Sequence, residues 1–163
     1  ASEFLRSVQS FASTRVAVIG DVMLDIWLEG PVRRISQEAP IPVVELTGRE
    51  ESPGGAANVA ELLANLGATV SLLGVVGQDD EASALREAVR SKNVTARFVG
   101  DGGRPTTTKT RVVSGTQQIC RLDVEDRSPV RASVDRVSLY YSHSASGLRL
   151  RSTDNGQRTA DRW

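Results

Sequence analysis

Apolar residues in this chain occur in short uninterrupted runs and in one stripe with helical spacing. Residues 15–20 form a run closed by a glycine, which predicts a first central strand that is buried on both faces. Residues 69–76 form a second run of the same kind. Residues 22–28 and 41–47 are rich in branched and aromatic side chains and are separated by an irregular stretch that contains Gly30, Pro31 and Pro40. We expect these two segments to form a pair of strands outside the main sheet.

Two helices are predicted between and after these runs. Over residues 56–66 the apolar positions fall on one side of a helix, and Gly67 follows where a left-handed cap is favoured; these positions are Val59, Leu62, Leu63 and Leu66. A second helix is predicted over residues 81–91, with Asp79 or Asp80 available to cap its first turn. The order strand, loop, helix, strand, loop, helix predicts an α/β fold with a parallel sheet covered by helices.

The pattern changes towards the end of the chain. Residues 106–113 and 116–123 flank Ser114-Gly115, which predicts a β-hairpin that projects from the sheet. After Asp126 the sequence is dominated by Ser, Arg, Gly, Thr and Asn. We therefore expect a folded unit over residues 1–126 and an irregular tail over residues 127–163, disordered from about Ser142 onward.

Composition restricts the class of protein. A chain of 163 residues with 39% apolar content predicts one domain with a hydrophobic core. No apolar run approaches the roughly 18 residues of a membrane span, and residues 1–14 lack the pattern of a signal peptide, so a cytoplasmic protein without a membrane partner is expected. Cys120 is the single cysteine, which excludes an intramolecular disulfide, and its place in a predicted strand indicates a buried thiol without a role.

The net charge of zero conceals an uneven distribution. Residues 1–126 carry 13 basic and 17 acidic side chains, a balance of −4, and residues 127–163 carry 7 and 3, a balance of +4. A nucleic-acid-binding tail would show denser basic clustering or interleaved aromatic residues, so no nucleic-acid partner is expected. His143 is the only histidine and has no matching ligands nearby, so neither a metal site nor a catalytic triad is predicted.

The segment from Gly54 to Gly77 carries the most specific chemistry. Gly54 and Gly55 open a predicted helix, where backbone can approach a polyhydroxylated ligand closely and the first-turn N–H groups are free to donate. Asn58 lies within that first turn and offers both a donor and an acceptor. Asp21 directly follows the first strand, at the edge where open α/β sheets bind ligands, although it would equally serve to cap a turn. We expect Asp21, Gly54, Gly55 and Asn58 to converge on one polar cleft.

Three further charged residues have two interpretations each. Asp25 either holds a second hydroxyl of the ligand or lies in solvent at the base of the projecting strand. Lys109 and Arg111 alternate along the first strand of the hairpin and therefore share a face. They either bind a phosphate, if the hairpin folds over the cleft, or form a solvated strand face.

Residues 16–126 resemble the N-terminal half of the PfkB, or ribokinase-like, carbohydrate kinases. The first signature of that family is matched at its fixed positions from Gly54 to Gly77. More narrowly, residues 20–25, 34–44 and 108–112, with Gln117-Gln118, resemble the bacterial heptose-7-phosphate kinases that serve ADP-heptose and lipopolysaccharide synthesis. The resemblance implies a doubly wound sheet with a projecting β-lid and phosphoryl transfer from Mg-ATP to the anomeric hydroxyl of a heptose 7-phosphate.

The resemblance also implies roles for particular residues. Asp21, Gly54, Gly55 and Asn58 fall on the sugar-binding positions of the family, and Lys109 and Arg111 fall on the lid, where positive charge would hold the existing phosphate. A homodimer through the lid strands is implied as well, because it would cover their exposed edges.

The chain lacks the Gly-Ala-Gly-Asp-like turn that supplies the catalytic base and anion hole of the family, and it lacks both common nucleotide-binding fingerprints. We therefore expect no catalytic residue and no ATP or Mg²⁺ site in this chain, and little or no activity. A reading-frame shift after about residue 126 would explain this pattern. Two other functions stay open: a non-catalytic module that binds sugar phosphates or dimerises through its lid, and a sibling kinase for ribose, fructose or a nucleoside.

Overall fold

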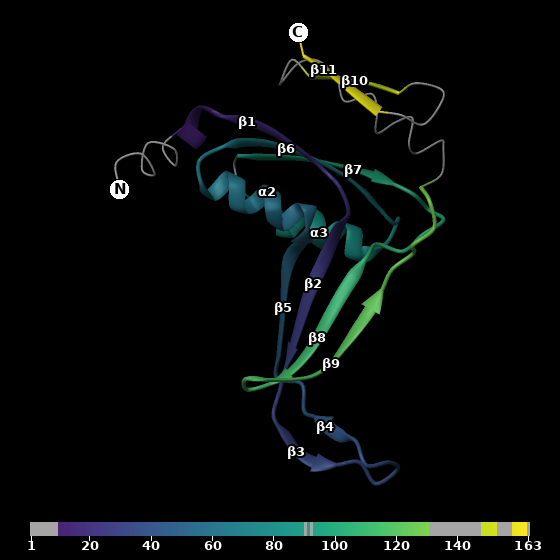
Figure 1. The fold of residues 1–163 in the computed structure, drawn as a ribbon. Helices are drawn as coiled ribbons and strands as arrows, with labels where there is room; N and C mark the ends of the chain where they lie inside the picture. Colours follow the sequence, from purple (N-terminus) through teal and green to yellow (C-terminus); the bar gives the residue numbers. More distant parts are fainter. Residues whose placement is uncertain (1–9, 90, 92, 131–147, 153–157, 163) are drawn as a thin grey trace.

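The computed structural model describes residues 10–89, 91, 93–130, 148–152 and 158–162 (Figure 1). Three strands form a parallel sheet in the order β1-β6-β7: β1 (Arg15–Ile19), β6 (Thr69–Val76) and β7 (Val94–Gly100). A short 3₁₀ helix, η1 (Phe11–Ser13), precedes β1. The predicted parallel sheet is therefore confirmed. The prediction of a buried central first strand is wrong, because β1 lies at the edge of this sheet and alternates between exposed and half-buried positions.

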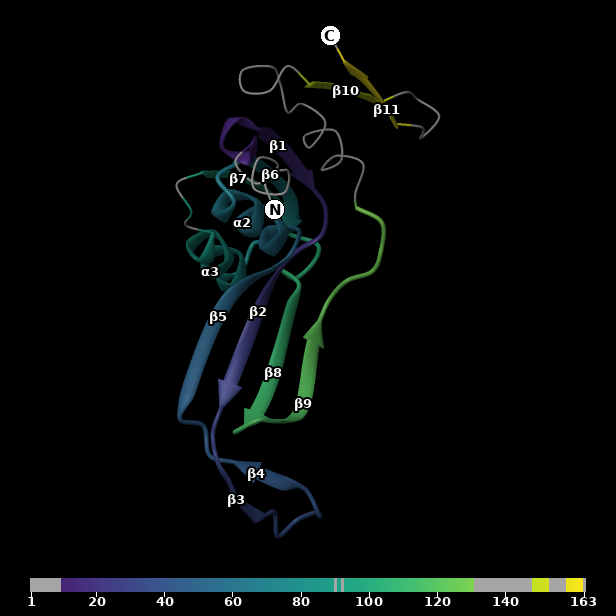
Figure 2. The ribbon, with the colours of Figure 1, turned by 60° about the vertical axis from the view of Figure 1, so that its left-hand side comes forward.

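Four strands form a second sheet that extends away from the first (Figure 2). Their order is β5-β2-β8-β9, with β2 (Val22–Glu29) antiparallel to β5 (Gly48–Gly55) and parallel to β8 (Thr108–Ser114), which pairs with β9 (Gln117–Val124). We call this four-stranded sheet the lid sheet. It confirms the predicted α/β fold with a projecting β-lid. The hairpin turn consists of Gly115-Thr116, one residue later than predicted, because Ser114 pairs with Gln117.

The expected pairing of residues 22–28 with residues 41–47 is wrong. β2 pairs instead with β5, a strand that sequence analysis did not predict. Within residues 41–47 the structure has only β4 (Pro42–Val44), which pairs with β3 (Val32–Ile35) in a separate two-stranded sheet at the far end of the lid sheet. β5 escaped prediction because Arg49, Glu50 and Glu51 give it no apolar alternation.

Two helices lie where the sheets meet. α2 (Ala56–Asn65) packs on β5 and β6, and α3 (Asp80–Ala88) packs on β5 and β2. Gly67 follows α2 with a φ of 101°, as its predicted role in a left-handed cap requires. Among the helices in the described part of the chain, none has the length and apolar character needed to cross a membrane.

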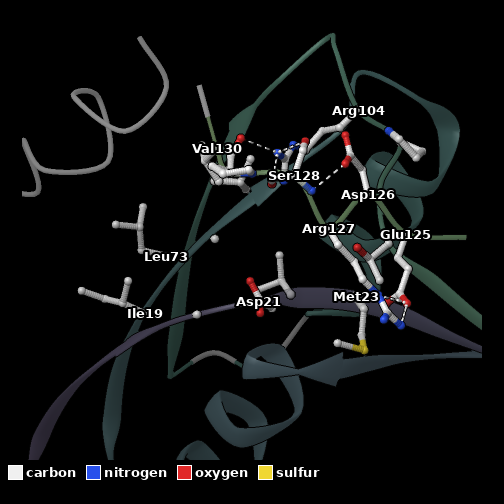
Figure 3. A pocket seen from close by; sticks show the side chains of 17 residues that line it. Ile19, Asp21, Met23, Leu73, Arg104, Glu125, Asp126, Arg127, Ser128 and Val130 are labelled. Atoms are coloured by element: carbon white, nitrogen blue, oxygen red, sulfur yellow. Dashed lines mark hydrogen bonds and ion pairs between the residues drawn. The ribbon is translucent and has the colours of Figure 1, made fainter. Parts of the chain in front are cut away.

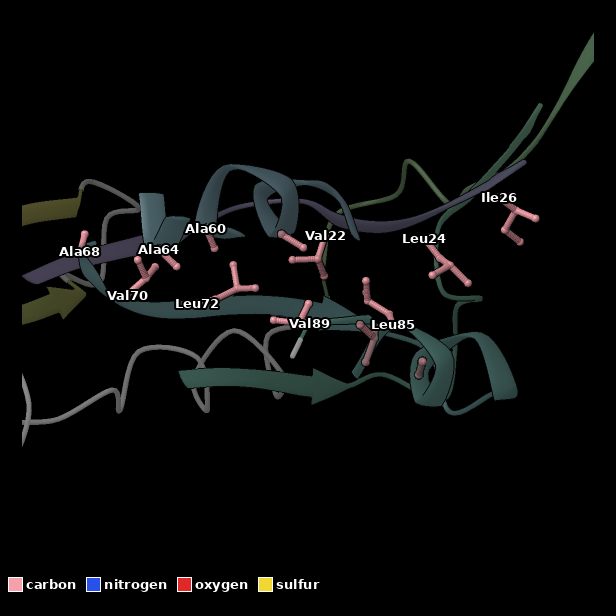
Figure 4. Close-up of a cluster of buried hydrophobic side chains, with 13 residues drawn as sticks. Val22, Leu24, Ile26, Ala60, Ala64, Ala68, Val70, Leu72, Leu85 and Val89 are labelled. Carbon is pink, nitrogen blue, oxygen red and sulfur yellow. The ribbon is translucent and has the colours of Figure 1, made fainter. Parts of the chain in front are cut away.

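The hydrophobic core joins the two helices to β2 and β6 (Figure 4). Leu24, Leu72 and Leu85 are fully buried there. Three positions of the predicted apolar stripe of α2, Val59, Leu62 and Leu66, are exposed, and the fourth, Leu63, is partly buried against the core. The fully buried residues of α2 are Ala57, Ala60 and Ala64. Close approach of α2 to β6 requires small side chains on the buried face, so the alanines point inward.

A hydrogen-bonded clasp connects the start of α3 to the segment before β8. Asp79 caps α3 by accepting from the backbone N–H of Ala82 at 2.9 Å, as predicted. The same carboxylate accepts from the backbone N–H of Thr106 at 2.8 Å and from its hydroxyl at 2.5 Å. Burial raises the pKa of Asp79, but these hydrogen bonds outweigh it and leave the pKa below its ordinary value.

The end of the chain differs from the sequence prediction at Cys120. Cys120 is exposed, contrary to the prediction, because β9 is an edge strand of the lid sheet and has no helix packed on it in the described residues. In the predicted tail the structure describes β10 (Leu148–Ser152) and β11 (Arg158–Arg162), which pair antiparallel with each other. His143 lies outside the described residues, as do all tail residues in the ranges 131–147 and 153–157 and residue 163.

Candidate functional site

A cleft of about 660 Å³ opens at the carboxyl ends of β1 and β6 (Figure 3). One wall is largely apolar and comes from the ends of these strands and the beginning of β2. The opposite wall comes from two segments next to the lid strands, before β8 and after β9. The residues that line the cleft are Ile19, Gly20, Asp21, Val22, Met23, Leu73, Gly74, Val75, Arg104, Pro105, Thr107, Glu125, Asp126, Arg127, Ser128, Pro129 and Val130.

Asp21 is the predicted site residue that lines this cleft directly. Its side chain is exposed, and Figure 3 shows it in the middle of the hollow. The backbone carbonyl of Asp21 accepts a hydrogen bond from Ala56 N–H at 2.9 Å, which ties the end of β1 to the beginning of α2. An exposed carboxylate at the carboxyl end of parallel strands is well placed to accept hydrogen bonds from sugar hydroxyls.

The glycine pair lies behind the cleft and does not line it. Gly54 and Gly55 end β5 and pair with Met23 and Val22 of β2. A Cβ atom at Gly54 would lie 2.5 Å from Asp25 Oδ2, so only glycine fits between the strand and this carboxylate. Gly55 has a φ of 57°, and a Cβ there would collide with the carbonyl oxygen of Asp21. The glycines therefore bring Asp21 and Asp25 close to the start of α2.

Asn58 lies in the first turn of α2 with an exposed side chain and does not line the cleft. Asp21 and Asp25 lie close to the glycine pair, and Met23, which lines the cleft, has its side chain beside both glycines. The convergence of Asn58 with them stays a prediction.

Asp25 and Arg111 form an ion pair on the lid sheet. Arg111 Nη1 donates to Asp25 Oδ1 at 2.6 Å, and both side chains are 22% exposed. The guanidinium also lies over the ring of Trp27 at 5.0 Å from its centroid. Arg111 therefore has a fixed orientation, while most of its five N–H donors are not used by Asp25.

Lys109 lies on the same face and is held by two carboxylates. Its ammonium group donates to Asp123 at 3.0 Å and to Glu125 at 3.3 Å. The bond to Asp123 raises the pKa of Lys109 most strongly, burial opposes this, and the bond to Glu125 adds to it. Arg121 also pairs with Asp123, and Arg127 with Glu125. The hydrogen bonds lower the pKa of both carboxyl groups. These ion pairs form a continuous row from Arg121 and Asp123 on the lid sheet to Glu125 and Arg127, which line the cleft.

Sequence analysis missed Arg104, Glu125 and Arg127 as cleft residues. A signal existed for Glu125, because it continues the alternation of Asp123 beyond β9 and thus shares a face with Lys109. Arg104 and Arg127 lie in irregular segments without periodicity, and only the folded chain brings them together.

The described residues include no cluster of three or more His, Cys, Asp or Glu side chains that could hold a metal ion.

Comparisons with known proteins identify the family of the chain. The model of the pfkB family carbohydrate kinases matches residues 13–138. The chain belongs to the pfkB family of carbohydrate kinases. The matched range extends past Asp126, where sequence analysis placed the end of the resemblance.

Individual relatives and solved structures show which kinases the chain is similar to. The chain is 52% identical over 119 residues to the bifunctional protein HldE of Alcanivorax borkumensis, which covers 73% of this chain and 25% of that protein. In structure it is similar to a carbohydrate kinase from Agrobacterium tumefaciens, with a TM-score of 0.56, 21% identity, and coverage of 68% of this chain and 35% of the other. It is also similar to the ribokinase of Arabidopsis thaliana complexed with ribose and ATP, with a TM-score of 0.51, 21% identity, and coverage of 68% and 35%. The chain thus spans about a quarter of the length of the curated relatives it matches.

Proposed function

We propose that this chain forms the sugar-binding part of a heptose-7-phosphate kinase, whose complete reaction transfers a phosphoryl group from ATP to the anomeric hydroxyl of the sugar. The observation that carries the proposal is the cleft, in which the exposed carboxylate of Asp21 lies between an apolar wall and a wall of mixed charge that includes Arg104 and Arg127. The likeness to the HldE proteins favours a heptose as the sugar, and with it a cytoplasmic step of ADP-heptose and lipopolysaccharide synthesis.

The lid supplies the group that would recognise the existing phosphate. Arg111 uses one donor on Asp25 and is held flat by Trp27, so its remaining donors can form the paired hydrogen bonds that suit a phosphate. Lys109 is less suited, because two of its three donors are already taken by carboxylates. We therefore assign phosphate recognition to Arg111 and the support of the lid to Lys109.

Calorimetric titration of the chain with heptose 7-phosphate and with the unphosphorylated heptose tests this function. The wild type is expected to bind the phosphorylated sugar more tightly. Asp21→Asn is expected to weaken both ligands by roughly tenfold, since a hydrogen bond to a charged group contributes about 1.5–3 kcal/mol. Arg111→Ala is expected to weaken only the phosphorylated sugar.

Arg86→Ala is the matched control, because Arg86 is an exposed arginine on α3 that stacks on Phe98 outside the cleft. Its titration should match that of the wild type. Absence of any heat with heptose 7-phosphate would refute the proposal. Binding without ADP release in the presence of Mg-ATP would favour a non-catalytic sugar-phosphate-binding module instead.

We further propose that two copies associate through their lid sheets. β9 is an edge strand, and its side chains Leu122 and Val124 are 56% and 49% exposed. An unpaired strand edge beside exposed apolar side chains favours pairing with another strand.

A further inference from the structure

Arg104 contacts the wall of the cleft that follows β9. Arg104 Nη2 donates to the carbonyl oxygen of Ser128 at 2.9 Å and to that of Pro129 at 3.3 Å, and it lies 3.5 Å from the hydroxyl of Ser128. Ser128 and Pro129 follow β9 and, with Glu125 and Arg127, line the cleft opposite the ends of β1 and β6 (Figure 3). We call residues 125–130 the wall segment.

Arg104 itself is anchored to the end of the main sheet. Its side chain is 13% exposed, and Nε lies 3.3 Å from Asp101 Oδ2, an ion pair that lacks hydrogen-bond geometry. Asp101 is 4% exposed, follows β7, and donates its backbone N–H to the Val76 carbonyl at the end of β6 at 2.8 Å. One guanidinium therefore joins the carboxyl edge of the parallel sheet to the wall segment.

Burial of the ion pair between Arg104 and Asp101 costs free energy of desolvation. Burial of a charged pair is repaid only by good geometry and further hydrogen bonds, and Arg104 obtains these bonds from wall carbonyls. A guanidinium can reach two carbonyls and a carboxylate at once because its donors lie in a rigid plane, whereas a lysine ammonium cannot span the same partners.

We infer that Arg104 is a positioning residue for the candidate sugar site: it fixes the wall segment so that Arg127 and Glu125 stay at the cleft opposite Asp21. Arg127 has a side chain that is 85% exposed and pairs with Glu125, which Lys109 also holds. The placement of Arg127 therefore depends on its backbone and on this one ion pair. This inference rests on the proposed function, since it deepens the account of the same cleft.

Two measurements on the full chain test the inference. In hydrogen–deuterium exchange, Arg104→Ala is expected to speed exchange in residues 125–130 while β6 and β7 keep their wild-type rates. In calorimetric titration, the same variant is expected to bind heptose 7-phosphate roughly tenfold more weakly, which corresponds to the loss of about one charged hydrogen bond. A purely structural role would change exchange in the strands as well.

Arg104→Lys provides the second variant, because it keeps a positive charge beside buried Asp101 and therefore preserves the fold if Arg104→Ala does not fold. It is expected to loosen the wall segment and to weaken binding by about threefold, because the ammonium keeps only part of the contacts. Arg86→Ala should leave both readouts unchanged.

The outcomes separate the two proposals. If the wild type does not bind heptose 7-phosphate, the proposed function is wrong and this inference is overturned with it. If the wild type binds and both Arg104 variants bind equally well, only the inference is overturned. Unchanged exchange in residues 125–130 in a folded Arg104→Ala chain would also overturn it.

Discussion

Single residues hold together segments that lie between the two sheets. Asp79, which connects the start of α3 to the segment before β8, is the best example. One carboxylate caps α3 and holds Thr106, which in turn accepts from Gly77 N–H at 2.8 Å. Asp79→Ala should lower the free energy of unfolding by about 1–2 kcal/mol, because it removes the cap and leaves Thr106 without this acceptor. Urea denaturation at pH 7 measures the change. Asp80→Ala is the control: this neighbour is exposed and should cost less than about 0.5 kcal/mol.

The same residue predicts a pH dependence. The folded-state pKa of Asp79 lies below its ordinary value of 3.8, so its contribution to stability is fully present above about pH 4. The contribution is lost as the pH falls through the folded-state pKa. The difference in unfolding free energy between wild type and Asp79→Ala should therefore shrink between pH 4 and more acidic solutions. A difference that stays constant down to pH 2 would contradict this assignment.

The candidate site shows which residues a sequence can reveal. Asp21 was predictable because the end of a strand in an α/β fold has a defined place. The shared face of Lys109 and Arg111 followed from the period of a strand, and the structure confirms it. Their carboxylate partners lie up to 86 residues away along the chain, as for Asp25 and Arg111, so pairing could not be read from local spacing.

At the scale of elements, α2 shows that a sequence pattern can predict a helix without predicting which of its faces is buried. Its spacing predicted the helix and its end, yet Leu62 and Leu66 are exposed, Leu63 is only partly buried, and the fully buried positions are alanines. The sequence pattern reflects only how apolar each residue is. Close packing of α2 on β6 requires in addition that the side chains between them are small. The edge position of β1 could not be predicted for a related reason: an apolar run does not show how many strands or helices pack against it.

This arrangement of α2 makes a prediction that is opposite to the one from apolarity alone. Ala60 is completely buried, so Ala60→Leu should overpack the core and destabilise the chain by about 1–3 kcal/mol. Leu62 is 57% exposed, so Leu62→Lys should change the free energy of unfolding by less than about 0.5 kcal/mol. Thermal unfolding followed by circular dichroism compares the two. A larger loss for Leu62→Lys would mean that the apolar stripe is covered in solution.

At the scale of the whole molecule, apolar surface remains uncovered on both sheets. Ile19 on β1 and Leu122 on β9 are 49% and 56% exposed, and both strands are sheet edges in the described residues. Exposed edges with apolar side chains favour association, and the likeness to longer sugar kinases covers only part of those proteins. Local patterns predicted the elements, but which surfaces stay open depends on the complete set of packed partners.

The lid sheet is the surface on which association can be tested most sharply. Leu122 and Val124 lie on one face of β9, opposite to the face of Lys109 and Asp123. If copies join through this sheet, Leu122→Lys with Val124→Lys should shift the chain from dimer to monomer at micromolar concentration, because two desolvated ammonium groups would meet in the interface. Sedimentation velocity measures the mass. Leu62→Lys is the matched control, since Leu62 is about equally exposed but lies on α2 and not on β9, and it should leave the dimer intact. Loss of the dimer in the control alone would place the contact on α2, and a monomeric wild type would exclude lid association altogether.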